Sequence, residues 1–340
     1  MEKVLVGLSG GVDSSVCALL LKQQGYQVIG ATMKLLDGDS SDIDDVCNKL
    51  DIECLELDYT DSFKREVIDY FAKEYNECRT PNPCVMCNKK FKFGKFYDYA
   101  NNNNIKYIAT GHYAKIEYSQ EYGRYVLKKS NNLEKDQSYF LYNIDKNILP
   151  YVLFPLAEYN SKDEIRNIAR ENDLSVYSKS DSQDICFIKN NDYKKFLVDN
   201  NYVSDKAGNI ILNDKIIGKH DGLYKYTIGQ RKGLGLSFEE PLYVTGFDKD
   251  NNNLYVGLEE DLYIDKFRVK DYNLLLSDEI KEPMLVDVKV RYKSKESKAY
   301  IRMVDDYIEV CYLEKQKGVT PGQSAVFYID DIVLGGGIIE

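Results

Sequence analysis

Histidine is nearly absent from this chain of 340 residues, since His112 and His220 are the only two. The chain also lacks the paired Cys, or Cys and His, spacings of a zinc site, so neither a histidine-ligated metal enzyme nor a Ser-His-Asp hydrolase is expected. No apolar run reaches the roughly 18 residues that a membrane span needs. The start, MEKVLVGLSG, has no basic segment followed by a long apolar core, so we expect a cytoplasmic protein without a signal peptide or a membrane partner.

Cysteine occurs eight times, but without a secretory signal that would favour a disulfide framework. We therefore expect a reducing compartment, in which cysteines are buried thiols, catalytic thiols or metal ligands. Four are interpreted as small buried hydrophobic residues: Cys17, Cys47, Cys54 and Cys311. Cys78 is left open, and the other three lie in motifs described below.

Negative charge is in excess, but one short segment holds most of it. The net charge is −10, and residues 37–61 contain ten acids and one lysine, a local charge of −9. Elsewhere the chain is close to neutral, so basic patches dominate their own surroundings. The patches are Lys89, Lys90, Lys92 and Lys95; Lys215, Lys219, Lys225, Arg231 and Lys232; and Lys289, Arg291, Lys293, Lys295, Lys298 and Arg302. Each alone is typical of a solvated face, yet together they leave a nucleic-acid partner open.

The first 110 residues alternate strand-like and helix-like segments, which is typical of a parallel sheet with helices on both faces. Strands are expected at 3–8, 26–33, 52–58 and 105–112, and helices at 16–24, 41–50, 61–76 (with Asp61 as N-cap), 161–172 and 191–199. After residue 200 glycines become frequent, and from about residue 265 short alternating runs indicate an antiparallel sheet or small barrel. We expect an α/β fold with domains at 1–200, 201–264 and 265–340.

A glycine-rich loop from Gly7 to Ser15 joins the first expected strand to the first expected helix. Glycines let the backbone approach an anion closely, and the helix start adds unpaired N–H groups and a positive dipole end. Asp13 would repel a phosphate unless a cation lies between them, which predicts Mg²⁺. The loop has neither the Gly-Lys-Ser/Thr ending of a kinase-type P-loop nor the Gly-x-Gly-x-x-Gly of a dinucleotide site, so both are excluded.

The spelling Ser-Gly-Gly-Val-Asp-Ser in this loop resembles the hallmark of the PP-loop ATP pyrophosphatases. The resemblance implies that ATP is split into AMP and pyrophosphate, that a carbonyl oxygen is adenylated, and that a nucleophile then displaces AMP. GMP synthetase, argininosuccinate synthetase, tRNA lysidine synthetase and several sulfur transferases share this motif. It therefore does not choose the substrate by itself.

Two cysteine-containing segments narrow the choice. In RTPNPCVMCNKK, residues 79–90, the prolines favour a rigid, non-helical approach to Cys87. We expect a helix to begin near Asn88, which would place Cys87 at its N-terminus beside Lys89 and Lys90 and lower the pKa of its thiol. The second segment, SDSQDICFI, contains Cys186.

With these segments the chain resembles the tRNA-specific 2-thiouridylase family from end to end. The resemblance is carried by SGGVDSS, TPNPCVMCNKKFKFG, YIATGHYA, KDQSYFLY, DSQDICFI, YTIGQRKGLG, VRYK and TPGQSAVFY. It implies a tRNA-uridine 2-sulfurtransferase that uses ATP to replace the C2 oxygen of the wobble uridine by sulfur, giving 2-thiouridine, AMP and pyrophosphate. It also implies a catalytic PP-loop domain, two tRNA-binding domains that grip the anticodon arm, and a persulfide donor such as a cysteine desulfurase or a relay protein.

The resemblance also implies roles for individual residues. Nucleotide binding is implied for Gly7, Leu8, Ser9, Gly10, Gly11, Val12, Asp13, Ser14, Met33 and Gly111. Contact with tRNA is implied for Asn82, Pro83, Cys84, His112, Lys135, Asp136, Gln137, Arg291, Tyr292 and Gln323. Catalysis is implied for Asp13, Cys87 and Cys186. Cys186 would carry the incoming sulfur as a persulfide, and Cys87 would be the second thiol, which can end in a disulfide with Cys186.

Two features depart from the family pattern. Cys84 stands where the family commonly has Asp, which leaves its contact with the base open and creates a Cys84-x-x-Cys87 pair. With Cys186 this pair could supply three thiolates for an iron–sulfur cluster, so an iron–sulfur-dependent tRNA thiolase is an alternative, as is a PP-loop synthetase that acts on a small molecule. The loop after Met33 is shorter and more acidic than is usual in the family.

Overall fold

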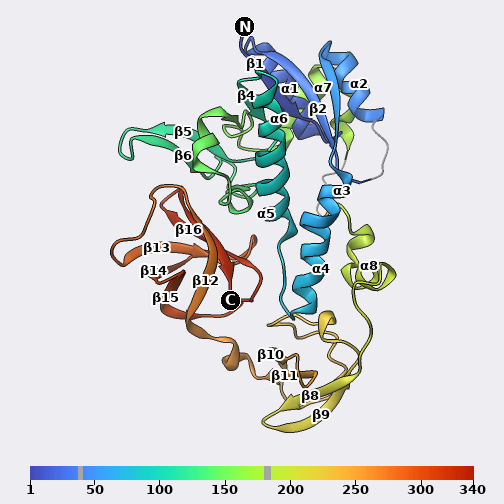
Figure 1. Ribbon diagram of the computed structural model, residues 1–340, viewed down its shortest axis with the longest axis vertical. Coiled ribbons are helices and arrows are strands. Elements are labelled where there is room, and N and C mark those ends of the chain that lie inside the picture. The colour runs from blue at the N-terminus through green and yellow to red at the C-terminus, as the bar shows by residue number, and fades with distance from the viewer. Residues whose placement is uncertain (37–40, 180–184) are drawn as a thin grey trace.

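The computed structural model describes residues 1–36, 41–179 and 185–340, and Figure 1 shows an N-terminal domain, a middle domain and a C-terminal barrel. The N-terminal domain is built on a five-stranded parallel sheet with the order β3-β2-β1-β4-β7. Its strands are β1 (Lys3–Gly7), β2 (Gln27–Lys34), β3 (Glu53–Asp58), β4 (Tyr107–Ala109) and β7 (Val152–Leu153). The strand order reverses between β1 and β4, and ligands bind at such a switch point beyond the carboxyl ends of the strands.

Helices cover both faces of this sheet, because successive apolar side chains of a strand point to opposite sides. One face is covered by α1 (Val12–Gln23), α2 (Ser41–Leu50) and α7 (Lys162–Glu171), and the other by α6 (Phe96–Asn102). Val4 and Val6 of β1 pack into the first core, whereas Leu5 between them packs with Phe96 in the second. The expected α/β architecture is confirmed.

Two long helices run side by side from the sheet toward the middle domain (Figure 1), and each contains a π-helical stretch. The first comprises α3 (Thr60–Phe63), η1 (Lys64–Ile68) and α4 (Asp69–Asn76), and the second comprises α5 (Pro83–Cys87), η2 (Asn88–Lys95) and α6. The rings of Phe63 and Phe91 lie 5.5 Å apart between centroids, and Lys95 pairs with Glu66 at 2.6 Å. The π-helical stretches therefore pack against each other.

The starts of both helices differ from the sequence-based expectation. Tyr59 is the N-cap of the first helix, not Asp61, which lies in its first turn. The second helix begins at Pro83, where the missing N–H of proline is no loss, because the first-turn N–H groups have no intrahelical partner. The expected start near Asn88 is therefore wrong, and Cys87 lies inside a helix.

The middle domain follows α8 (Tyr193–Asp199) and contains a four-stranded sheet with the order β10-β11-β8-β9. Its strands are β8 (Gly208–Leu212), β9 (Lys215–His220), β10 (Tyr243–Asp248) and β11 (Asn253–Gly257). Ile210, Val244 and Leu254 are fully buried in its core. Short 3₁₀ turns complete the chain: η3 (Ser138–Phe140), η4 (Lys146–Tyr151), η5 (Ser175–Ser178), η6 (Lys189–Asn191), η7 (Leu223–Lys225) and η8 (Glu259–Leu262).

Six antiparallel strands form the C-terminal barrel, which closes through the pairing of β12 with β17. They are β12 (Ile264–Leu274), β13 (Met284–Lys289), β14 (Ser297–Val304), β15 (Tyr307–Gln316), β16 (Ser324–Ile329) and β17 (Ile332–Ile339). The barrel was expected, but its extension was not. A hairpin of the N-terminal domain, β5 (Lys115–Ser119) and β6 (Arg124–Lys128), joins the same sheet through the pairing of Lys128 with Ile332.

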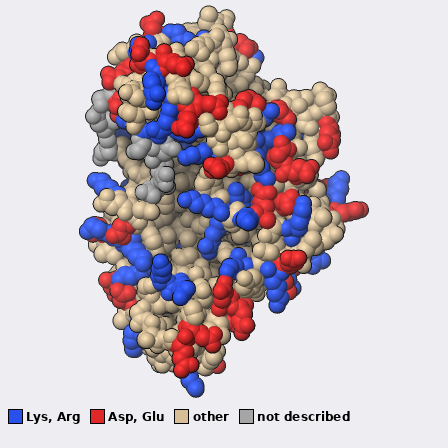
Figure 2. All heavy atoms as spheres, turned by 180° about the vertical axis from the view of Figure 1, so that it is seen from behind, with Lys and Arg blue, Asp and Glu red and all other residues tan. Residues whose placement is uncertain are grey.

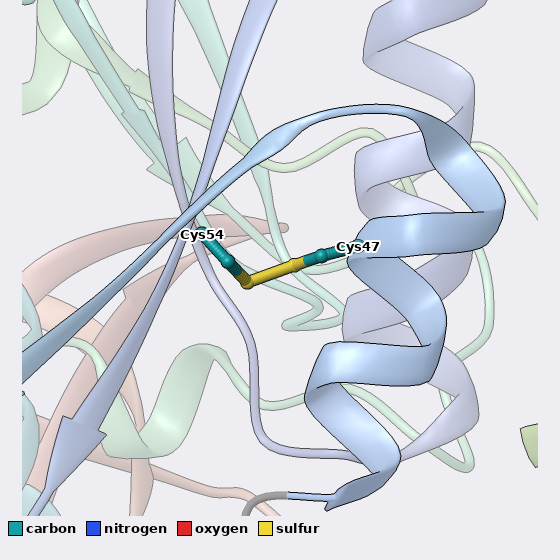
Figure 3. The surroundings of a disulfide bond; sticks show 2 residues. All are labelled: Cys47 and Cys54. Atoms are coloured by element: carbon teal, nitrogen blue, oxygen red, sulfur yellow. A yellow bond between two sulfur atoms is a disulfide. The ribbon is translucent and has the colours of Figure 1, made fainter.

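Cys47 of α2 and Cys54 of β3 form a disulfide bond (Figure 3). The interpretation of these two residues as unpaired buried thiols is therefore wrong. Cys17 is a fully buried thiol as expected, whereas Cys311 is only half-buried. Among the residues that the structure describes, no helix is long and apolar enough to cross a membrane.

Candidate active site

The glycine loop after β1 leads directly into α1, which begins at Val12, earlier than the sequence suggested. Gly10 has a φ of +69°, a left-handed conformation that glycine adopts without steric cost. The Leu8 N–H donates to the Ala31 carbonyl at 2.9 Å, and the Ser9 N–H donates to the Ser14 hydroxyl at 3.2 Å. These bonds hold the loop so that the first N–H groups and the positive end of α1 lie at the carboxyl edge of the sheet, an arrangement that suits phosphate.

Three predicted nucleotide-binding residues from distant segments lie around this loop. A Cβ placed on Gly7 would lie 3.5 Å from Met33 Cε, so the end of β1 and the end of β2 are in contact there. A Cβ on Gly111 would lie 2.7 Å from the carbonyl carbon of Asp13 and 2.8 Å from Ser14 N. Only glycine permits this approach, so the segment after β4 is fitted against the nucleotide loop.

Asp13 is already paired within the protein. Its carboxylate accepts a hydrogen bond from the Tyr113 hydroxyl at 2.7 Å and forms an ion pair with Lys162, the first residue of α7, at 2.5 Å. The Lys179 ammonium donates to the Gly10 carbonyl at 3.1 Å. Sequence reasoning missed Lys162 and Lys179, because isolated lysines far along the chain carry no signal that they return to this loop.

The sulfur-bearing residues are placed by the second long helix and by the segment before η6. Cys84 and Cys87 lie in α5 and Cys186 lies after the segment 180–184, which is outside the described residues and includes part of the predicted motif. All three are free thiols; Cys84 and Cys186 are exposed and Cys87 is half-buried. The thiol of Cys186 acts electrostatically on those of Cys84 and Cys87, so the three lie within electrostatic range of one another.

Desolvation raises the pKa of all three thiols, to about 12 for Cys87, since even the exposed ones are closely surrounded by protein. The expected lowering of the Cys87 pKa is wrong, because this residue is not at a helix N-terminus and burial disfavours its thiolate. The positive charge of Lys92 opposes the shift at each thiol. Within the described residues, no three His, Cys, Asp or Glu side chains are grouped so as to hold a metal ion.

His112 joins the two halves of the site. Its Nε2 lies 3.5 Å from Lys92 Nζ and its Nδ1 lies 2.7 Å from the Thr110 hydroxyl. Burial, with the adjacent Lys92 charge, lowers the pKa of His112 well below its usual value, so the imidazole is neutral. Because Gly111 touches the nucleotide loop and His112 touches Lys92, the nucleotide loop and the thiols occupy the same edge of the sheet.

Several of the predicted tRNA-contact residues, from three separate segments, lie near Tyr139 or the start of α5. Asn82, the N-cap of α5, and the charge of Arg291 both lower the pKa of the Tyr139 hydroxyl, which itself donates to the Ser324 carbonyl at 2.9 Å. Gln323 of the loop before β16 donates to the carbonyls of Thr80 at 2.8 Å and Pro81 at 3.3 Å. Pro83 is buried beside Asn82. The segment that precedes the thiols is thus held by the C-terminal barrel.

Two further predicted contacts have internal roles. The Arg291 guanidinium donates to the carbonyl of Ile228 at 3.3 Å and to the hydroxyl of Thr320, which ties the middle domain to the barrel. Tyr292 stacks near Phe140, with 4.5 Å between centroids.

The loop 135–137 also faces inward in part. Asp136 is 4% exposed, and its carboxylate accepts hydrogen bonds from Ser130 N at 3.0 Å and from the Ser138 hydroxyl at 2.7 Å, so it organises the loop rather than facing a partner. Gln137 exchanges two hydrogen bonds with the backbone of Tyr113, whose hydroxyl binds Asp13. Lys135 is half-buried on the same loop.

Figure 2 shows the face opposite to that of Figure 1, where many Lys and Arg side chains gather across the middle of the molecule. Acidic side chains lie at the upper end of this face, along one side of its middle and near its lower end. A basic band of this kind attracts a phosphate backbone, although the whole chain is acidic.

A glycine loop at the switch point of a parallel sheet, a facing set of thiols and two appended β domains define a nucleotide-dependent enzyme of the PP-loop type. Comparison with family models agrees. The models described as the tRNA methyl transferase HUP domain, its PRC-barrel domain and the aminomethyltransferase beta-barrel domain match residues 2–190, 194–258 and 264–339.

Two curated relatives span the whole chain. The tRNA-specific 2-thiouridylase MnmA of Clostridioides difficile is 45% identical over 361 residues, which cover 100% of this chain and 98% of that protein. The protein of the same name from Acetivibrio thermocellus is 45% identical over 357 residues, with coverages of 100% and 99%. The chain belongs to the tRNA-specific 2-thiouridylase family.

Proposed function

We propose that this protein is a tRNA-uridine 2-sulfurtransferase, which uses ATP to replace the C2 oxygen of a wobble uridine by sulfur. The observation that carries the proposal is the contact made by two consecutive residues. Gly111 lies against the nucleotide loop, and His112 lies beside Lys92, whose charge acts on all three thiols. These contacts support the proposal, because they connect the groups proposed to activate the oxygen with the groups proposed to deliver sulfur. The activity named for relatives that match the full chain supports the same reaction.

In the first half of the reaction, ATP would bind through its phosphates to the loop and to the first turn of α1. Attack of the uridine C2 oxygen on the α-phosphate forms an O–P bond, breaks the bond to the pyrophosphate leaving group and converts the oxygen into part of a good leaving group. Lys162 and Lys179 are the cations that stand nearest the loop among its recorded partners. Asp13 would hold Mg²⁺, which would neutralise charge on the phosphates of ATP, since Mg²⁺ commonly binds one or two carboxylates plus substrate phosphates.

In the second half, a persulfide on Cys186 would attack C2 of the adenylated base, form a C–S bond and release AMP. The sulfur then bridges Cys186 and the base. The Cys87 thiolate, having lost its proton to solvent, attacks the Cys186 sulfur, so that a Cys87–Cys186 disulfide forms and 2-thiouridine leaves. An external thiol reductant restores both cysteines, and a persulfide-carrying donor protein reloads Cys186.

The partner that fits the surface is a tRNA presented by its anticodon arm. The basic band across the middle of the molecule would hold phosphates, and the base would leave its stack to reach the thiols. Asn82, Cys84 and Gln323 stand around the entrance to α5 and are proposed to hold the base and its neighbours. We propose the cytoplasm, where tRNA is used, as the compartment.

The test combines the purified full-length chain with ATP, Mg²⁺, a persulfide donor and unmodified tRNA, followed by mass spectrometry of the nucleosides. The wild type should yield 2-thiouridine and pyrophosphate in a tRNA-dependent manner. Cys186→Ser should form no 2-thiouridine while it still binds ATP. Pyrophosphate release without tRNA, and without any need for Cys186, would instead favour a synthetase for a small molecule.

A further inference from the structure

Lys92 follows the two thiols of α5 by five and eight residues, a spacing that would separate them in an ordinary helix. In an α-helix, at about 100° per residue, Lys92 would point about 140° away from Cys87. The segment from Asn88 to Lys95 is π-helical, however. With roughly 4.4 residues per turn, or about 82° per residue, the same five steps leave Lys92 only about 50° from Cys87 and nearly in line with Cys84.

A glycine makes the wider turn possible. A Cβ on Gly94 would lie 2.8 Å from the carbonyl oxygen of Lys89, five residues earlier, which is closer than Cβ atoms normally approach. In this register a side chain at position 94 would therefore meet the backbone of Lys89. Such stretches are rare, and they concentrate at functional sites.

Among the described residues, no carboxylate neutralises the charge of Lys92, so this charge acts on the cysteine thiols. Within the same part of the chain, Lys92 is the only cation that lowers the pKa of Cys84, Cys87 and Cys186 together. Its recorded partner is neutral: because an ammonium only donates, His112 Nε2 accepts at 3.5 Å, and the Nδ1 proton then faces Thr110. The histidine therefore orients Lys92 without cancelling its charge.

We infer that Lys92 is the cation of the sulfur-transfer site, carried onto the face of the thiols by the π-helical turn η2 and oriented by neutral His112. This inference rests on the proposed function. It names the residue that stabilises negative charge during the sulfur-transfer half of the reaction. The ammonium keeps its proton throughout. It stabilises negative charge on the persulfide before attack and on the Cys87 thiolate before disulfide formation. The charge of the persulfide leaves with AMP, and the charge of the Cys87 thiolate leaves with the thiolated base, which then takes a proton from solvent.

The experiment compares the full-length wild type with Lys92→Met and Lys92→Arg, with Lys90→Gln as the matched control on an exposed position of the same helix. Alkylation of Cys87 by iodoacetamide is followed at fixed pH, without tRNA, by peptide mass spectrometry. Lys92→Met should slow alkylation about tenfold, which corresponds to one pKa unit. Lys92→Arg should restore most of the rate, and Lys90→Gln should leave it unchanged.

A second readout separates the two halves of the reaction. Lys92→Met should release AMP and pyrophosphate with tRNA close to the wild-type rate for the first turnover, yet form 2-thiouridine at least tenfold more slowly. Unchanged alkylation in a Lys92→Met protein with wild-type circular dichroism would overturn the inference, as would equal losses of adenylation and thiolation. A wild type that makes no 2-thiouridine would overturn the proposed function instead, and the alkylation result would still decide on Lys92.

Discussion

The nucleotide loop and the thiol site lie at the same edge of one sheet, but they reach their resting states in different ways. Among the described residues around the loop, the charged groups are partnered: Asp13 is paired with Lys162, and Lys179 is paired with Asp42 and bonded to the Gly10 carbonyl. Around the thiols one cation faces three sulfur atoms whose pKa values desolvation has raised. The charges of the loop are therefore paired without ATP, whereas the raised pKa values favour the protonated, unreactive form of the thiols.

This difference fits the order of the two chemical steps. A protonated thiol does not attack a persulfide or a disulfide, so in the proposed mechanism the raised pKa values of the thiols would oppose premature sulfur transfer. Two consecutive residues, Gly111 and His112, connect the two regions. Variants in and around that contact can therefore separate the loop from the thiols.

Gly111→Ala should have the largest effect, because it acts on the contact itself. The new Cβ would meet the backbone of Asp13 and Ser14 at 2.7 and 2.8 Å, and neither can move without shifting the start of α1. We expect a loss of adenylation of about 100-fold or more, the scale that a displacement of about 1 Å produces at an active site. Pyrophosphate release with tRNA measures it.

The control for this variant is Gly123→Ala, since Gly123 lies in the β5–β6 turn and has open space around it, although its φ of +61° gives the substitution some strain. Near-normal adenylation by Gly111→Ala would mean that the loop does not depend on its contact with the segment after β4. Slower Cys87 alkylation in the same variant would show that the two regions are coupled through His112.

Lys162→Met should act on the nucleotide loop alone. Among the described residues, removal of the ammonium leaves Asp13 with the Tyr113 hydroxyl, and with the Mg²⁺ ion proposed above, so less positive charge offsets the carboxylate beside the phosphates of ATP. We expect adenylation to fall about 30-fold. This is less than the roughly 100- to 1,000-fold loss on removing a donor that contacts the transition state, because Lys162 acts through Asp13. Cys87 alkylation should stay at the wild-type rate, as measured by peptide mass spectrometry. Lys162→Arg, which keeps the charge, should retain much of the adenylation, and an equal loss in both variants would contradict the charge argument.

Sequence reasoning identified the elements whose cause is local. The apolar run of β1, the glycines after it and the amphipathic segments that follow act within a few residues, so the parallel sheet and the nucleotide loop were predictable. Family resemblance added the cysteines and the tRNA-contact positions. The barrel strands were recognised for the same local reason, because alternating side chains specify a strand with one buried face.

The features that could not be predicted from the sequence depend on contacts between distant segments or on backbone geometry. Lys162 reaches Asp13 across 149 residues, and the pairing of Lys128 with Ile332 ties a hairpin of the first domain to the last strand. The two prolines before Cys84 suggested a rigid break, whereas the second of them opens the helix. A π-helical turn has no residue signature of its own, so the return of Lys92 to the thiol face could not be foreseen.

Gln323→Ala should have the smallest effect, and it tests whether the thiol site depends on the barrel. The side chain holds the carbonyls of Thr80 and Pro81, just before α5, so its loss removes two hydrogen bonds from the joint between domains. We expect a loss of about 1–2 kcal/mol in the free energy of unfolding. The KM for tRNA should rise a few-fold while ATP binding is unchanged, because the nucleotide loop lies in another part of the first domain.

Steady-state thiolation at varied tRNA concentrations measures this, with Gln316→Ala as the control, since that side chain bonds only its neighbour Glu314 at the surface of the same barrel. If Gln323→Ala changed the KM for ATP as much as that for tRNA, the barrel would support both regions equally. That result would contradict the hypothesis that the thiol site depends on the barrel whereas the nucleotide loop does not. If only the KM for tRNA rises, the barrel determines the position of the thiols through the segment before α5.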